Sequence, residues 1–122
     1  MRHFSMTIAS TNGYALVRLI GELDMLTAPD LSQLITALDP DDDLVAVDLS
    51  DLTFIDSKGI RALMSARHNG RPLALICPDG NRNISRVLEI AEASRVMPIY
   101  KRLEELLDDG QQPLDAAAAA AG

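Results

Sequence analysis

The chain has 122 residues, a length typical of one domain, and its net charge is -7. Apolar residues make up 48% but aromatic residues only 3%, so we expect one aliphatic core. Without a cluster of Lys and Arg, this charge argues against direct nucleic-acid binding. It favours a protein partner with a basic patch, or simply solubility. No apolar run approaches the roughly 18 residues that span a bilayer, and no signal peptide is evident, so we expect a soluble, cytoplasmic protein with no membrane contact.

The first third of the chain predicts a β-hairpin and then a helix. Two strand-like runs, Phe4–Ala9 and Tyr14–Ile20, flank the turn signal STNG, and Gly21 is expected to end the second strand. A helix should follow Thr27, because Thr27 and Asp30 resemble a capping box. Its apolar positions at helical spacing are Leu31, Leu34, Ile35 and Leu38.

The rest of the chain predicts alternating strands and helices. The expected segments are a strand at Leu44–Leu49, a helix from Asp56–Ser57 to Asn69–Gly70, a strand at Leu73–Cys77, a helix at Asn83–Glu92, a strand at Val96–Tyr100 and a helix at Lys101–Leu107. The order β-β-α-β-α-β-α-β-α indicates an α/β fold. Its sheet should be mixed and mostly parallel, with the N-terminal hairpin at one edge and helices packed against it.

The C-terminal end has a different composition. After the helix the chain reads QQPLD and then six alanines, Ala116–Ala121. An alanine run this short is a marginal helix by itself. We therefore predict one domain at residues 1–108 and a flexible Ala-rich tail at residues 109–122.

The sequence contains no recognisable catalytic or metal-binding motif. His3 and His68 lack metal-ligand spacing, and the phosphate-binding, dinucleotide-binding and nucleophile-elbow patterns do not occur. The single cysteine, Cys77, lies in the apolar run LALIC, which predicts a buried, inert thiol. We expect no enzyme activity, no cofactor and no bound metal.

The most informative stretch is Val45–Ala62, VAVDLSDLTFIDSKGIRA, where Ser57 falls at a strand-to-helix junction. A serine there can cap the helix, and its hydroxyl would face solvent. Phosphate on that hydroxyl would meet the free N–H groups and the positive dipole end of the helix. Without a base or metal nearby, Ser57 is more suited to be a substrate than a catalyst. Taken alone, the pattern D-S-x-G is also explained by a helix cap with no other role.

Three segments together make the chain resemble the STAS family, specifically bacterial anti-sigma factor antagonists. They are GELDMLTAPDL at Gly21–Leu31, VDLSDLTFIDSKGI at Val47–Ile60 and VLEIAEASRVMPIYKRLEELL at Val87–Leu107. The resemblance covers about Met6 to Leu107 and implies the STAS fold. It departs from the family at Lys58, where Ser or Thr is common, and at Ala93–Arg95, where Thr-Gly or Ser-Gly is common.

The resemblance implies an anti-anti-sigma factor whose phosphorylated residue is Ser57. The unmodified protein would bind an anti-sigma factor with serine kinase activity, and so release a sigma factor. The kinase would then phosphorylate Ser57, and a metal-dependent serine phosphatase would reverse that change. Asp24, Asp56, Lys58 and Gly59 would join Ser57 in partner binding, with Lys58 partly offsetting the phosphate charge.

Two other functions stay open on the sequence. One is a non-switching STAS interaction or scaffold subunit, in a signalling assembly or a lipid transporter, because one fold supports many functions. The other is a small hydrolase that uses Ser57, but no His partner is evident in the motif.

Overall fold

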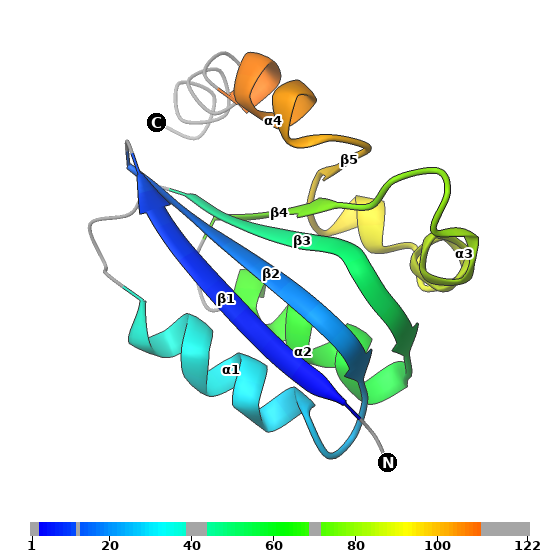
Figure 1. Ribbon diagram of the computed structural model, residues 1–122. Coiled ribbons are helices and arrows are strands. Elements are labelled where there is room, and N and C mark those ends of the chain that lie inside the picture. Colours follow the sequence, from blue (N-terminus) through cyan, green and yellow to red (C-terminus); the bar gives the residue numbers. More distant parts are fainter. Residues whose placement is uncertain (1–2, 12, 39–43, 69–71, 111–122) are drawn as a thin grey trace.

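The computed structural model describes residues 3–11, 13–38, 44–68 and 72–110. Its strands form one sheet in the order β1-β2-β3-β4-β5 (Figure 1). Their bounds are β1 (Phe4–Thr11), β2 (Tyr14–Leu23), β3 (Leu44–Ile55), β4 (Leu73–Ile76) and β5 (Ile99–Tyr100). β1 pairs with β2 antiparallel, and the other neighbouring strands pair parallel. The predicted α/β fold with an edge hairpin is confirmed.

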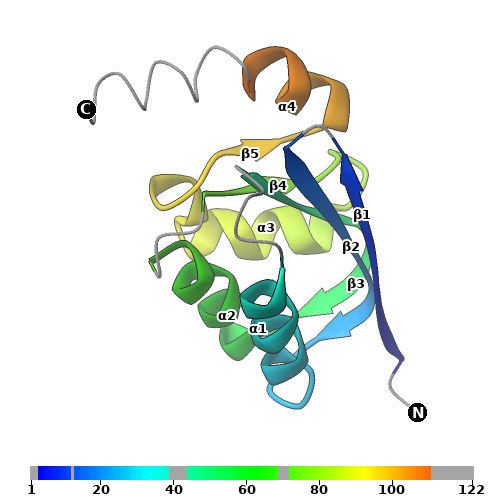
Figure 2. The ribbon, with the colours of Figure 1, turned by 90° about the vertical axis from the view of Figure 1, so that its left-hand side faces the viewer.

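The helices alternate with the strands as the sequence predicts. They are α1 (Ala28–Ala37), α2 (Ser57–His68), α3 (Arg82–Ile90) and α4 (Leu103–Gly110), with a short 3-10 helix η1 at Ala93–Arg95. Figure 2 shows α1, α2 and α3 on one side of the sheet, and α4 on the other side, above β5. No helix within the described ranges is long and apolar enough to cross a membrane.

Aliphatic side chains form two hydrophobic clusters on opposite faces of the sheet. The larger cluster lies between the sheet and helices α1 to α3, and it takes alternate residues of β2 and β3. These alternate residues are Ala15, Val17, Leu19, Val45, Val47 and Leu49. The smaller cluster takes the intervening residues of β3 and β4 and is covered by Leu106 of α4. Both faces of the central strands are therefore buried, which explains their nearly continuous apolar runs.

β2 continues through Gly21 to Leu23, so the prediction that Gly21 ends the strand was wrong. Gly21 has a φ of +100°, and a Cβ atom there would lie 1.9 Å from the carbonyl oxygen of His3. The pairing register between β2 and β3 shifts on both sides of Gly21. The glycine thus marks a bulge within the strand, a conformation that residues with a side chain rarely adopt.

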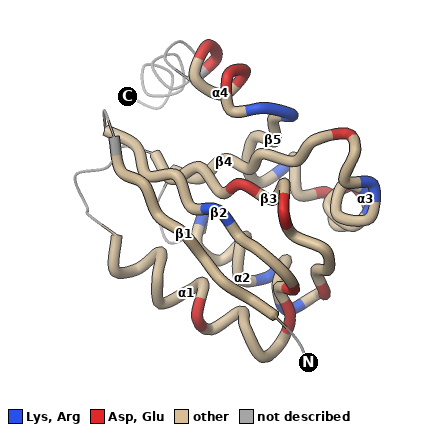
Figure 3. Tube along the Cα trace, in the orientation of Figure 1, with Lys and Arg blue, Asp and Glu red and all other residues tan. Residues whose placement is uncertain are grey.

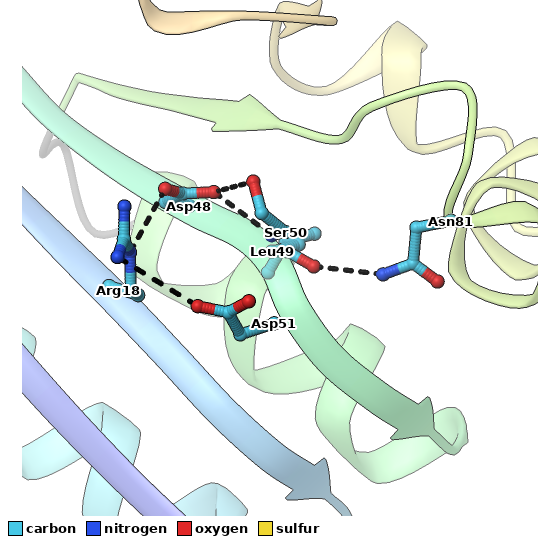
Figure 4. Close-up of polar contacts among 6 residues, drawn as sticks. All are labelled: Arg18, Asp48, Leu49, Ser50, Asp51 and Asn81. Atoms are coloured by element: carbon cyan, nitrogen blue, oxygen red, sulfur yellow. Dashed lines mark hydrogen bonds and ion pairs between the residues drawn. The ribbon is translucent and has the colours of Figure 1, made fainter.

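β3 also runs further than predicted, from Leu44 to Ile55, and polar contacts hold its second half (Figure 4). On β2, Arg18 Nε donates to Asp48 Oδ2 at 3.3 Å, and the guanidinium lies 3.8 Å from Asp51. Just before α3, the side-chain Nδ2 of Asn81 donates to the carbonyl oxygens of Leu49 at 3.0 Å and Leu52 at 2.8 Å. The Asn81 bonds satisfy carbonyls of the irregular part of the strand and tie it to the segment before α3.

Other predicted bounds differ from the structure by a few residues. Val96 does not join β5, because the segment Ala93–Arg95 before it closes a 3-10 turn. α4 runs past the predicted domain end at residue 108 to Gly110. The predicted turn at Asn12, the helix stop at Asp39–Asp43, the N-G signal at Asn69–Gly70 and most of the tail, residues 111–122, lie outside the described residues.

Cys77 is buried at the end of β4, as the sequence predicts. Burial raises the pKa of its thiol, and the negative charges of Asp79 and Asp48 raise this pKa further. The thiolate is the reactive form of cysteine, so a raised pKa and low exposure both slow its chemistry.

We therefore expect Cys77 to resist alkylation in the folded protein at neutral pH. Iodoacetamide labelling, followed by intact-mass spectrometry, should be much slower in buffer than in urea. It should accelerate as the pH rises above the ordinary thiol pKa, because the thiolate population then grows. Equal rates in buffer and in urea would show that Cys77 is accessible and reactive.

Candidate functional site

The candidate site lies where the parallel strands β2 and β3 end side by side. Leu23 and Ile55 are paired in register, and the backbone N–H of Asp56 donates to the Leu23 carbonyl oxygen at 3.2 Å. The loop after β2 and the first turn of α2 therefore begin next to each other. Ligand sites in open α/β folds form at such carboxyl ends of strands.

Asp56, rather than Ser57, is the N-cap of α2. The Asp56 carboxylate accepts a hydrogen bond from the Gly59 N–H through Oδ1 at 2.9 Å, and its carbonyl accepts from the Ile60 N–H at 3.0 Å. Ser57 is the first residue of the helix. The prediction that Ser57 caps α2 was wrong, because the preceding carboxylate already fills the capping position.

Ser57 and Lys58 are exposed on the first turn of α2. Within the described part of the chain, the Ser57 hydroxyl makes no hydrogen bond. It has no described base as a partner, and α2 does not need it as a cap. Charged oxygens added there would lie beside the positive end of the helix dipole. The hydroxyl is thus available for modification without loss of a structural contact.

Asp24 is 1% exposed and organises the loop after β2. Its Oδ1 accepts hydrogen bonds from the N–H groups of Leu26 at 2.9 Å and Thr27 at 3.2 Å, which is an Asx turn. The Thr27 hydroxyl donates to the Glu22 carbonyl at 2.9 Å and accepts from the Asp24 N–H at 2.9 Å. Thr27 makes no side-chain bond to α1, so the predicted capping box with Asp30 was wrong.

The Asp56 carboxylate also binds the loop that Asp24 organises. Its second oxygen, Oδ2, accepts a hydrogen bond from the Met25 N–H at 3.1 Å. The side chains of Met25 and Leu26 point away from the core and are 61% and 68% exposed. One carboxylate therefore ties an exposed apolar pair to the start of the helix that carries Ser57.

Gly59 is buried where α2 passes the end of β2. A Cβ atom at this position would lie 2.6 Å from the Leu23 carbonyl oxygen and 2.9 Å from the Leu23 and Ile55 side chains. A larger residue would push the first turn of α2 away from the sheet. Gly59 thus contributes to the site through close packing of the helix.

The structure brings all five predicted site residues to one end of the sheet, where they have different roles. Ser57 and Lys58 are on the surface, whereas Asp24, Asp56 and Gly59 shape the backbone around them. Partner binding by these five residues stays a prediction. Sequence reasoning missed that Met25 and Leu26 are exposed beside the site and that Thr27 bonds its own loop. The spacing D-x-x-T at Asp24–Thr27 was the available signal, since an Asp whose side chain bonds the next residues' N–H groups forms an Asx turn.

The arrangement is suited to docking and to accepting a modification. Among the described residues, no three His, Cys, Asp or Glu side chains are placed to hold a metal ion. Basic residues are spread over β2, α2, α3 and the segment before α4, with acidic residues between them (Figure 3). Along the described chain, acidic positions thus interrupt the basic ones, unlike the clustered Lys and Arg typical of nucleic-acid binding.

We expect the corrected cap to be visible in stability measurements. Asp56→Ala should lower the free energy of unfolding by about 1–2 kcal/mol, because it removes the N-cap of α2. Ser57→Ala should change the free energy of unfolding by less than about 0.5 kcal/mol, because it removes only an exposed hydroxyl that has no described hydrogen-bond partner. Urea unfolding followed by circular dichroism measures both values. Equal losses for the two variants would contradict the assignment of Asp56 as the cap.

Comparisons with known proteins identify the family and the fold of this chain. Residues 6–98 match the family model described as "Mlab, STAS domain". An anti-sigma factor antagonist from Mycobacterium paratuberculosis superposes with a TM-score of 0.78 at 23% identity, over 88% of this chain and 93% of that one. The anti-sigma factor antagonist SpoIIAA in its unphosphorylated form superposes with a TM-score of 0.68 at 18% identity, over 88% of this chain and 96% of that one.

A transporter-related protein has the same fold. The sulfate transporter family protein from Wolinella succinogenes superposes with a TM-score of 0.69 at 12% identity, over 88% of this chain and 92% of that one. Among curated proteins, no sequence matches this chain significantly. At these identities the structural likeness establishes the fold, and the function has to be argued from the site.

Proposed function

This chain belongs to the STAS domain family, and from that premise we propose that it is a cytoplasmic anti-sigma factor antagonist controlled by phosphorylation of Ser57. Its unmodified form binds an anti-sigma factor that has serine kinase activity, which frees a sigma factor for transcription. The kinase phosphorylates Ser57 with ATP, and a metal-dependent serine phosphatase removes the phosphate. The chain itself serves as a binding partner and a substrate.

One observation carries this proposal: Ser57 is exposed directly after the residue that caps α2. Its hydroxyl has no hydrogen bond among the described residues, so a kinase reaches it without disturbing the fold. Structures of anti-sigma factor antagonists, including SpoIIAA in a phosphorylated form, share the fold and support this interpretation.

The switch would act through charge at the interface. A phosphate adds a charge of about -1.5 to -2 at neutral pH next to the Asp56 carboxylate. The first N–H groups and the dipole of α2 stabilise that charge on the free protein. A partner that docks over Ser57 would instead meet excess negative charge in a partly desolvated interface, where like charges are costly. Phosphorylation should therefore weaken binding and leave the domain folded.

A second candidate function is a non-switching STAS subunit of a signalling assembly or a lipid transporter. The match to the model described as "Mlab, STAS domain" and the fold of the Wolinella succinogenes transporter protein favour it. Affinity purification with mass spectrometry separates the two functions. A serine kinase that dissociates when Ser57 is phosphorylated supports the switch, whereas transporter subunits that stay bound to both forms support the second function.

We expect Ser57 to be the main phosphoacceptor. Incubation with the recovered kinase and ATP, followed by peptide mapping, should place the phosphate on Ser57, because its hydroxyl is exposed and has no hydrogen bond to another described residue. Ser57→Ala should abolish the signal. Ser65→Ala is the matched control, since Ser65 is an exposed serine on the same helix. Phosphate found mainly on Ser50, Ser65 or Ser85 would contradict the proposal.

We expect Ser57→Asp to weaken kinase binding without unfolding the domain. A carboxylate in the first turn of α2 is favoured by the dipole, so thermal stability should stay near wild type. Affinity measured by calorimetry should fall at least about tenfold, or roughly 1.4 kcal/mol. Ser57→Asn is the uncharged control and should bind more tightly than Ser57→Asp. Equal affinity of Ser57→Asp and wild type would show that charge at this position does not act as a switch.

A further inference from the structure

The Asp56 carboxylate joins two backbone segments that are distant in sequence. Oδ1 accepts from the Gly59 N–H at 2.9 Å, within the first turn of α2. Oδ2 accepts from the Met25 N–H at 3.1 Å, in the loop between β2 and α1. The first bond is an ordinary helix cap, but the second is not needed to begin α2. It fixes the position of the loop relative to Ser57.

Several further hydrogen bonds of the loop join its own residues. Asp24 Oδ1 accepts from the N–H groups of Leu26 and Thr27, and the Thr27 hydroxyl bonds the backbone of Glu22 and Asp24. These four hydrogen bonds set the curvature of the loop, and none of them involves a residue of α2. The Met25 N–H bond to Asp56 makes that connection through a side chain.

The loop presents apolar surface at the same end of the sheet as Ser57. Met25 and Leu26 are 61% and 68% exposed, while most other Leu side chains of the described chain are buried. An exposed pair of this kind, adjacent to a modifiable hydroxyl, is suited to a protein partner. For this apolar pair to serve as a binding surface, its position relative to Ser57 must be fixed, because a partner has to contact the pair and Ser57 at the same time.

We propose that Asp56 is a positioning residue that holds Met25 and Leu26 in a fixed relation to Ser57, so that the kinase recognises the apolar pair and the acceptor hydroxyl as one rigid surface. The inference rests on the proposed function and assigns the partner an apolar recess beside its phosphoryl-transfer cleft. A surface that is ordered before binding loses less conformational entropy on association. Asp56 thereby affects recognition through the loop and not through its own contact with the partner.

Asp56→Asn separates the two roles of the carboxylate. Asparagine is as good an N-cap as aspartate, so its carbonyl oxygen keeps the Gly59 bond and α2 stays intact. Its NH2 group then faces the Met25 N–H, and two donors cannot form a hydrogen bond. Asp51→Asn is the matched control, because it removes the same charge from an exposed carboxylate on β3 whose ion partner is Arg18.

Amide hydrogen exchange of the isolated protein tests the positioning directly. Asp56→Asn should speed exchange of the Met25 N–H at least about tenfold and leave the Ile60 and Leu63 amides unchanged, because opening is local. Asp51→Asn should leave all three amides as in wild type. Unchanged exchange at Met25 in Asp56→Asn would overturn the positioning role.

Steady-state kinetics with the recovered kinase test whether that position serves recognition. Asp56→Asn should raise KM for phosphorylation of Ser57 about tenfold with kcat within about twofold, since docking and not chemistry is affected. In a Met25→Ala/Leu26→Ala background the same change should raise KM less than about twofold, because the loop is then already lost as a contact. An equal rise in both backgrounds would overturn the inference, since Asp56 would then contact the kinase itself. Failure of the kinase to bind or phosphorylate wild type would refute the proposed function, whereas the exchange result would still decide whether Asp56 positions the loop.

Discussion

The site depends on one shared carboxylate at the end of two parallel strands. Because β2 and β3 end in register at Leu23 and Ile55, the residue after β3 lies within hydrogen-bond distance of the loop after β2. Asp56 uses one oxygen to begin α2 and the other to hold Met25. A carboxylate accepts several hydrogen bonds, so one side chain satisfies donors from two segments that would otherwise be exposed at the edge of the sheet.

This division of roles explains how Ser57 is available for modification. Since Asp56 caps the helix, the Ser57 hydroxyl forms no hydrogen bond with the residues that the structure describes, and it remains exposed. Gly59 allows the first turn of α2 to lie against Leu23, so the N–H groups of that turn are fixed before any phosphate arrives. A preformed helix end stabilises added negative charge at little cost. The fold thus separates the residue that maintains structure from the residue that is suited to carry a signal.

The irregular half of β3 is the second requirement of the site. The bulge at Gly21 changes the pairing between β2 and β3, and Asn81 satisfies the carbonyls of Leu49 and Leu52. The Asn81 side chain donates to β3, and in this orientation its oxygen makes no cap bond to α3. The two bonds to β3 are worth more than a cap on α3. Unsatisfied carbonyl groups in a covered strand raise the free energy of the folded state more than uncapped N–H groups that water can reach.

The sequence by itself determined the order of strands and helices, the aliphatic core and the position of Ser57 at a strand-to-helix junction. Each of these follows from short-range patterns of apolar and turn residues, and the family resemblance carried by Val47–Ile60 added the STAS fold. Only the tertiary structure decided which residue caps α2, that Gly21 is a bulge and that Thr27 serves its own loop. The Asp56 bond to Gly59 and the Thr27 bonds to Asp24 and Glu22 are local. The Asp56 bond to Met25 and the pairing shift around Gly21 instead join segments about thirty residues apart. Local spacing carries no information about such bonds, because they exist only once β2 and β3 are paired.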